Sequence, residues 1–167
     1  MSFALLKQSA RIRYRPVRAA FLFVIMTVAF DAHASAATNE AEARALFTKF
    51  VAAQNAHSVS DIKTMLWNSP GMLLLARGAE IRGPEAVADR FKEYYEGTWR
   101  VEPDMSRFHV TSISQDVMQV LVPVIFTRGL PGQAPQDNKF LISQTLVHDA
   151  NGWHIASIIS IPNTQPK

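Results

Sequence analysis

Two acidic residues and a nearby histidine are the side chains of this sequence best suited to acid–base chemistry. His109 shares one face of an expected strand with Arg107 and Thr111, because side chains alternate between the two faces of a strand. Histidine titrates near neutral pH, and Asp104 or Glu102 would be its carboxylate partner. If this face lines a cavity, His109 is the candidate acid or base; if it faces solvent, the residue has a structural role only.

Five other residues have side chains suited to binding a small molecule: Trp67, Arg77, Tyr95, Trp99 and Gln144. The tryptophans would supply apolar walls and one N–H donor each, and the arginine would meet a ligand carboxylate. The glutamine lies between apolar residues of one strand face, where a buried amide needs a partner. Core packing or surface exposure is the structural alternative for each of them.

Metal and thiol chemistry have no support in the sequence. The chain contains no cysteine, and its five histidines are scattered without the short spacings of a metal site. A chain without cysteine has no thiolate nucleophile and no disulfide framework, so its apolar core alone must hold the fold. We therefore predict no metal and no cofactor.

The first 34 residues have the organisation of a secretory signal peptide. Basic residues precede an apolar run over residues 19–30, and Ala32-His33-Ala34 provides a small-residue cleavage site. The run is shorter than the roughly 20 apolar residues that span a membrane, so we favour cleavage after Ala34 over an uncleaved anchor. The prediction is a periplasmic or secreted domain formed by residues 35–167.

The net charge of +3 comes from this leader. Removing its five basic residues and Asp31 leaves 12 Lys and Arg against 13 Asp and Glu, a net charge of −1. A slightly acidic domain lacks the electrostatic signature of nucleic-acid binding. We predict neither a nucleic-acid partner nor membrane attachment after cleavage.

Helical signals dominate the first half of this domain. We expect helices over residues 39–55, 61–67 and 84–96. Asn39 and Ser60 would cap the first two, and Gly83 with Pro84 would begin the third. The third helix has an apolar and aromatic stripe that ends in Tyr94 and Tyr95, one of whose hydroxyls would reach a pocket.

Extended segments make up the rest. The pattern predicts strands over residues 72–77, 80–82, 99–102, 108–113, 117–127, 139–148 and 153–161. The segment 117–127 is apolar on both faces and should be central in the sheet, with Pro123 at a bulge or an edge. The expected class is α+β, with an antiparallel sheet and helices on one face.

Four short motifs carry a resemblance to a known superfamily. They are the helix end at Gln54-Asn55, Arg77-Gly78 after a strand, the helix start at 83–86, and the final strand start at 151–155. With the order of elements, they make residues 35–167 resemble the nuclear-transport-factor-2-like superfamily, close to its SnoaL-like branch. The resemblance implies a cone, in which a curved antiparallel sheet wraps around a long helix and encloses a pocket. It also implies a homodimer through the outer face of the sheet.

This superfamily contains isomerases, polyketide cyclases, dehydratases, epoxide hydrolases and modules that only bind or dimerise. We therefore predict an exported protein of the SnoaL-like type that binds a small apolar molecule in the cone. Two alternatives stay open: a non-catalytic dimerisation or interaction module, and an isomerase- or dehydratase-like enzyme.

Overall fold

The computed structural model describes residues 20–163, with side chains from residue 38 onward. The chain forms two compact units, Met1–Ser35 and Ala36–Lys167. Most of the predicted leader therefore lies outside the described residues, and its cleavage stays a prediction. Among the described residues, no helix is both long and apolar enough to cross a membrane.

Helix α1 spans Ala20–Asn55 and runs through the segment that we expected to be a tether. The expected helix start with Asn39 as its N-cap is therefore wrong. The physical reason is local composition, because residues 32–37 include four alanines and alanine has the highest helix propensity. The apolar stripe is confirmed: Ala43, Phe47 and Phe50 are all buried.

Two shorter helices follow in the described chain. Helix α2 spans Val59–Met65 and begins two residues earlier than expected, because the Ser58 hydroxyl accepts a hydrogen bond from the Asp61 amide (3.4 Å) and caps it. Helix α3 spans Pro84–Tyr94, as the glycine–proline start predicted. Its cap, Gly83, has a φ of +86° that favours glycine.

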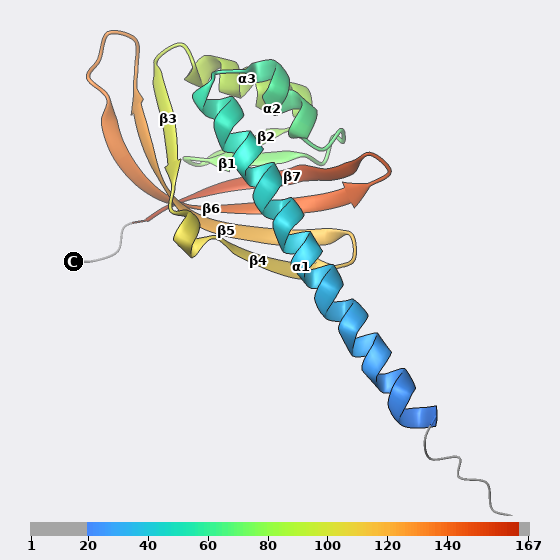
Figure 1. The fold of residues 1–167 in the computed structure, drawn as a ribbon. Helices are drawn as coiled ribbons and strands as arrows, with labels where there is room; N and C mark the ends of the chain where they lie inside the picture. Colours follow the sequence, from blue (N-terminus) through green and yellow to red (C-terminus); the bar gives the residue numbers. More distant parts are fainter. Residues whose placement is uncertain (1–19, 164–167) are drawn as a thin grey trace, which may run out of the picture. The chain divides into compact units, whose positions relative to one another are not determined.

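The described strands form one curved sheet, across which the later part of α1 lies (Figure 1). Its members are β1 (Leu73–Ala76), β2 (Ala79–Arg82), β3 (Thr98–Pro103), β4 (His109–Ser114), β5 (Val117–Gly129), β6 (Gln136–Asp149) and β7 (Gly152–Pro162). The order is β2-β1-β7-β6-β5-β3, and β4 also pairs with β5. The α+β class is confirmed, although the β1–β7 pair is parallel and the sheet is not antiparallel throughout.

Strand β5 lies inside the sheet, one strand from its edge, and only its inward-facing residues are buried, so the prediction of a central strand covered on both faces holds in part. Two strands share one of its edges in succession. β3 ends opposite Val124, the short helix η1 (Met105–Arg107) intervenes, and β4 begins opposite Leu121. Pro123 lies between them, and its carbonyl accepts a hydrogen bond from the Asp104 amide (2.9 Å). Because the N and the C=O of a strand residue point to the same side, the missing N–H of this proline faces the interruption and costs no ladder bond.

The free edge of β3 is covered by side chains that follow from the end of α1. The Asn55 amide donates to the Val101 carbonyl (3.0 Å) and accepts from the Val101 N–H (2.8 Å). The His57 ring is hydrogen-bonded to the Trp99 carbonyl (3.0 Å). Edge strands present unpaired backbone groups, so these contacts both satisfy β3 and join it to the helix.

Replacing Asn55 with alanine should lower the free energy of unfolding by about 1–3 kcal/mol, since two backbone groups of β3 lose their partner. Urea denaturation followed by circular dichroism measures the change. Asn68→Ala is the matched control, because Asn68 is exposed and its side chain has no hydrogen bond among the described residues. Equal stability of the two variants would contradict a structural role for the Asn55 contact.

Candidate functional site

A narrow cavity lies between the helices and the concave face of the sheet. Its volume is about 40 Å³, and its walls come from α1, α3 and strands β1, β3, β5, β6 and β7. Seven of its 19 lining residues are aromatic: Phe47, Phe50, Phe91, Tyr94, Trp99, Phe126 and Phe140. We call this space the inner cavity; it holds about three water molecules at most.

The aromatic rings of the wall are packed against one another. Tyr94 and Trp99 are stacked, with ring centroids 4.6 Å apart and an interplanar angle of 3°. Trp99 also contacts Phe126 (5.0 Å), which contacts Phe140 (5.5 Å). Such contacts hold each ring in place, so the cavity has a rigid apolar wall.

Polar atoms without protein partners interrupt this wall. Gln144 is 1% exposed, and neither atom of its side-chain amide has a hydrogen-bond partner among the described residues. Its strand neighbours Val120 and Ile158 offer none. The buried Trp99 indole N–H is likewise unpartnered. The Tyr95 hydroxyl is also buried without a partner, but Tyr95 does not line the cavity. Buried polar groups are normally hydrogen-bonded, so the Gln144 and Trp99 atoms are the ones available to a polar group inside the cavity.

A larger and more polar chamber adjoins the inner cavity. It has a volume of about 620 Å³, within the range of about 300–1,000 Å³ typical of small-molecule sites. Arg77, Tyr94, Trp99 and Arg128 line both spaces, so we treat them as one site. We call the larger space the outer chamber. The β5–β6 loop, residues 130–135, and the adjoining strand ends Gly129 and Gln136 contribute much of its wall.

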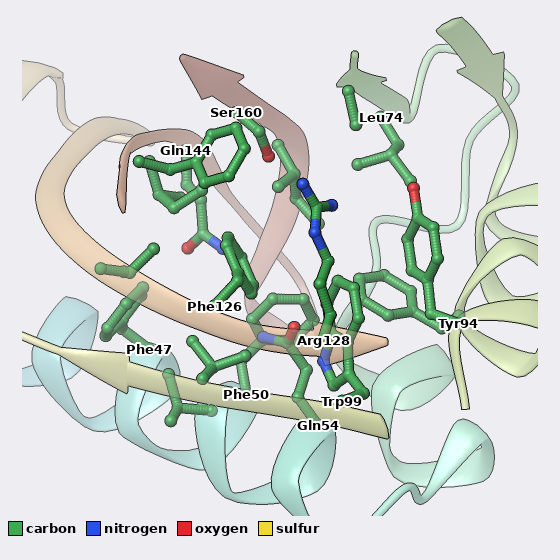
Figure 2. A pocket seen from close by; sticks show the side chains of 18 of the residues that line it. Phe47, Phe50, Gln54, Leu74, Tyr94, Trp99, Phe126, Arg128, Gln144 and Ser160 are labelled. Carbon is green, nitrogen blue, oxygen red and sulfur yellow. The ribbon is translucent and has the colours of Figure 1, made fainter. Parts of the chain in front are cut away.

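Two arginines stand where the two spaces meet. Arg128 extends from β5, with Gln144 and Ser160 on one side of its side chain and Tyr94 on the other (Figure 2). Burial, and then the positive charge of Arg77, lower the pKa of Arg128. Its guanidinium lies 5.3 Å from the Phe140 ring centroid. Burial raises the pKa of the neighbouring Tyr94 hydroxyl, so that group is a neutral hydrogen-bonding group at physiological pH.

Three of the five predicted binding residues line this site: Arg77, Trp99 and Gln144. Trp67 does not; it is half-buried after α2, where its backbone N–H donates to the Ile155 carbonyl (2.9 Å). Tyr95 does not either, because its ring stacks on His57 (4.6 Å). Adjacent helix residues point about 100° apart, and Tyr94 is the one that faces the cavity. The predicted placements of Trp67 and Tyr95 are therefore corrected.

The candidate acid–base residues lie away from the cavity. His109 is exposed on β4, whereas Phe108 is buried and Val110 packs on the core, so the polar face of this strand points to solvent. Asp104 is exposed and caps η1: its side chain accepts hydrogen bonds from the backbone amide and the hydroxyl of Ser106.

Glu102 is also exposed, and it pairs with Arg100 (2.8 Å). Among the described residues, no histidine or carboxylate lines the inner cavity. No group of three His, Cys, Asp or Glu side chains in the described chain could hold a metal ion.

Two residues of the site were not predicted from the sequence: Arg128, and Tyr94 as the tyrosine that faces the cavity. For the arginine, the sequence does contain a signal. Met118, Val120, Val122, Val124 and Phe126 alternate along β5 and are all buried. The next residue in this series is Arg128, so the period-2 pattern places it on the inner face. An arginine that continues an apolar strand face is a stronger indication of a site than a turn arginine.

Solved structures share this arrangement. A nuclear transport factor 2-like superfamily protein from Salmonella enterica serovar Typhimurium has a TM-score of 0.71 at 14% identity, covering 79% of this chain and 96% of that one. The hexachlorocyclohexane dehydrochlorinase LinA-type3 from Novosphingobium barchaimii has a TM-score of 0.68 at 11% identity, covering 78% and 90%. No protein-family model and no curated protein matches the chain. The fold is that of the nuclear-transport-factor-2-like superfamily, as the sequence predicted.

Replacing Gln144 with methionine should raise the free energy of unfolding of the ligand-free protein by about 1–2 kcal/mol, because an unpartnered buried amide is removed at similar volume. Thermal and urea unfolding measure the change. Gln119→Met is the control, since Gln119 donates to the Ser143 hydroxyl (3.3 Å) on the other face of the sheet and should give no gain. A loss of stability in Gln144→Met would show that the amide is paired within the protein.

Proposed function

We propose that this chain is an exported protein that binds a small, mostly apolar molecule in the inner cavity and outer chamber. The observation that carries the proposal is the Gln144 amide, which is buried against an aromatic cavity without a protein partner. A cavity with aromatic walls and few polar groups is the usual form of a small-molecule site. The amide would orient the bound molecule, and the rings would supply most of the buried area.

Binding is favoured over acid–base catalysis by the composition of the inner cavity. Isomerisation and elimination need a general base within hydrogen-bonding reach of the substrate. The described lining of the inner cavity offers arginine, tyrosine and amide side chains in place of a carboxylate or an imidazole. The carboxylates of the site, Glu93 and Glu96, line the outer chamber, and Glu93 is paired with Arg90 (2.7 Å). One structure of the same fold is named a dehydrochlorinase, but fold by itself does not carry a reaction to this chain.

Export is supported by the leader pattern of residues 1–34, with basic residues, an apolar run and a small-residue site. The absence of cysteine removes any need for an oxidising compartment to form disulfides. The charge balance of the remainder supports a domain that does not bind nucleic acid. The ligand would then be a molecule encountered outside the cytoplasm.

A neutral aromatic probe, 1-naphthol, should shift the nitrogen–proton NMR signals of the Trp99 indole and the Gln144 side-chain amide on titration. Ala76→Phe should weaken this binding about tenfold or more, because Ala76 lines the inner cavity and the added ring occupies it. Ala79→Phe is the matched control: Ala79 pairs with Ala76 across the hairpin, but it is exposed and lines neither space. Binding that is unaffected by Ala76→Phe would place the probe elsewhere and count against the proposal.

A second function, dimerisation, has support from the outer face of the sheet. The registers place Leu75, Ile159 and Leu121 in one row across the strands, with the polar Ser143 between Ile159 and Leu121, and Leu141 and Ile161 in the next row. All of the apolar members are half-buried or exposed, and Ile161 is 43% exposed. A band of this kind is typical of a protein–protein interface, and a second copy of the chain supplies a matching apolar face.

Native mass spectrometry of the chain expressed with its leader should show a dimer of subunits that lack residues 1–34. Ile159→Lys should give the monomer, because a charge in the centre of the band would be buried unpaired. Ala150→Lys, in the exposed β6–β7 turn, is the control and should stay dimeric. A monomer for the unaltered chain would refute dimerisation, and retention of the leader mass would refute export with cleavage.

A further inference from the structure

We propose that the bound molecule is a monocarboxylate with an aromatic body, its carboxylate held between Arg77 and Arg128. This inference rests on the proposed function and specifies the class of ligand. In this arrangement the apolar body lies along the aromatic wall, and its far end points toward Gln144.

Arg77 and Arg128 differ from most other arginines of the described chain in having no carboxylate partner. Four of the other described arginines have a carboxylate partner: Arg44, Arg82, Arg90 and Arg100. Arg77 and Arg128 have none among the described residues, although both line the inner cavity and the outer chamber. The positive charge of Arg77 lowers the pKa of the half-buried Arg128, so the site holds two like charges without a counterion. A carboxylate placed between them would remove the repulsion and accept hydrogen bonds from both guanidinium groups.

The backbone at Arg77 has a conformation that arginine rarely adopts. Arg77 and Gly78 form the two-residue turn between β1 and β2, and both have positive φ values, +53° and +80°. Glycine and asparagine are the residues that such turns favour, whereas an arginine in this conformation costs stability. The strained conformation places this side chain at the site, so the position is better explained by binding than by turn formation.

Acidic residues in the outer chamber limit the charge of an anion that could bind there. Glu93 and Glu96 also line the outer chamber, at the end of α3, and Glu93 is paired with Arg90 (2.7 Å). The C-terminal end of a helix carries partial negative charge. These groups oppose a multiply charged anion such as phosphate, while two guanidinium groups suffice for a single negative charge. The geometry therefore favours a carboxylate.

The aromatic wall and the size of the inner cavity limit the apolar part of the ligand. Tyr94 covers one face of the Trp99 ring, and the Phe126 ring is inclined at 47° to Trp99, so the three rings form an angled aromatic wall. The inner cavity, at about 40 Å³, admits only a short end group. Gln144 provides both a donor and an acceptor there. An aromatic acid with a hydroxyl or carbonyl at its far end meets these conditions, because its ring can make edge-to-face contacts with an angled wall.

The experiment compares 4-hydroxycinnamate with its neutral amide, 4-hydroxycinnamamide, by isothermal titration calorimetry of the full chain near neutral pH. The two probes have the same body and the same far hydroxyl, and they differ in charge at the head. The carboxylate should bind at least about tenfold more tightly, since charge-assisted hydrogen bonds are the stronger ones. Added sodium chloride should weaken its binding and leave that of the amide unchanged.

Variants assign the effect to the two arginines. Arg77→Gln and Arg128→Gln should each weaken carboxylate binding about tenfold and weaken amide binding clearly less, because a neutral carbonyl accepts weaker hydrogen bonds from a guanidinium group than a carboxylate does. Arg82→Gln is the matched control, because Arg82 pairs with Glu80 (2.6 Å) and lines neither space. Thermal unfolding verifies folding, and Arg128→Gln should unfold no earlier than the unaltered chain because a repelled, half-buried charge is removed.

The outcomes separate this inference from the function on which it rests. Equal affinity for the two probes, or equal weakening of both by the arginine variants, would overturn the carboxylate assignment and leave the binding function intact. Binding of 1-naphthol without binding of either cinnamic probe would do the same. If none of the three probes binds, both proposals fail.

Discussion

The hydrogen bonds between the Asn55 amide and both backbone groups of Val101 are the contact on which the site depends. They attach the end of α1 to the free edge of β3, at the border of the sheet. The next inward-facing residue of that strand is Trp99, whose carbonyl is held by His57. Trp99 in turn packs between Tyr94 and Phe126. One side-chain amide thereby fixes the strand that carries the central ring of the cavity wall.

The site combines features that cost stability with a wall that is rigid. The aromatic rings pack against one another as in an ordinary core, whereas Gln144 and the Trp99 N–H are buried without protein partners. Arg77 and Arg128 repel each other at the junction of the two spaces. Proteins keep such features at functional sites, where a bound molecule offsets their cost. The polar atoms also lie in a definite order, with the amide against the cavity and the cations at its junction with the outer chamber.

The period-2 alternation of β5, β6 and β7 gives the sheet two separate apolar surfaces. Inward-facing residues such as Val120, Val124 and Ile142 belong to the core around the cavity. Outward-facing residues such as Leu121, Leu141 and Ile159 form the band proposed as a dimer interface. Because the two sets lie on opposite faces, the proposed ligand site and the proposed dimer interface share no residues. A change on one face leaves the chemistry of the other in place.

Local patterns in the sequence determined the types and order of the elements, because helix and strand periodicity, glycine, proline and turn residues act over a few positions. The stripe on α1, the Gly83-Pro84 start of α3 and the inward face of Gln144 followed from such patterns. Tertiary structure decided the rest. It alone showed that the polar face of β4, with His109, points to solvent, that Tyr94 rather than Tyr95 faces the cavity, and that Arg77 and Arg128 converge. Each of these depends on which other element covers a given face, and that information lies far away in the chain.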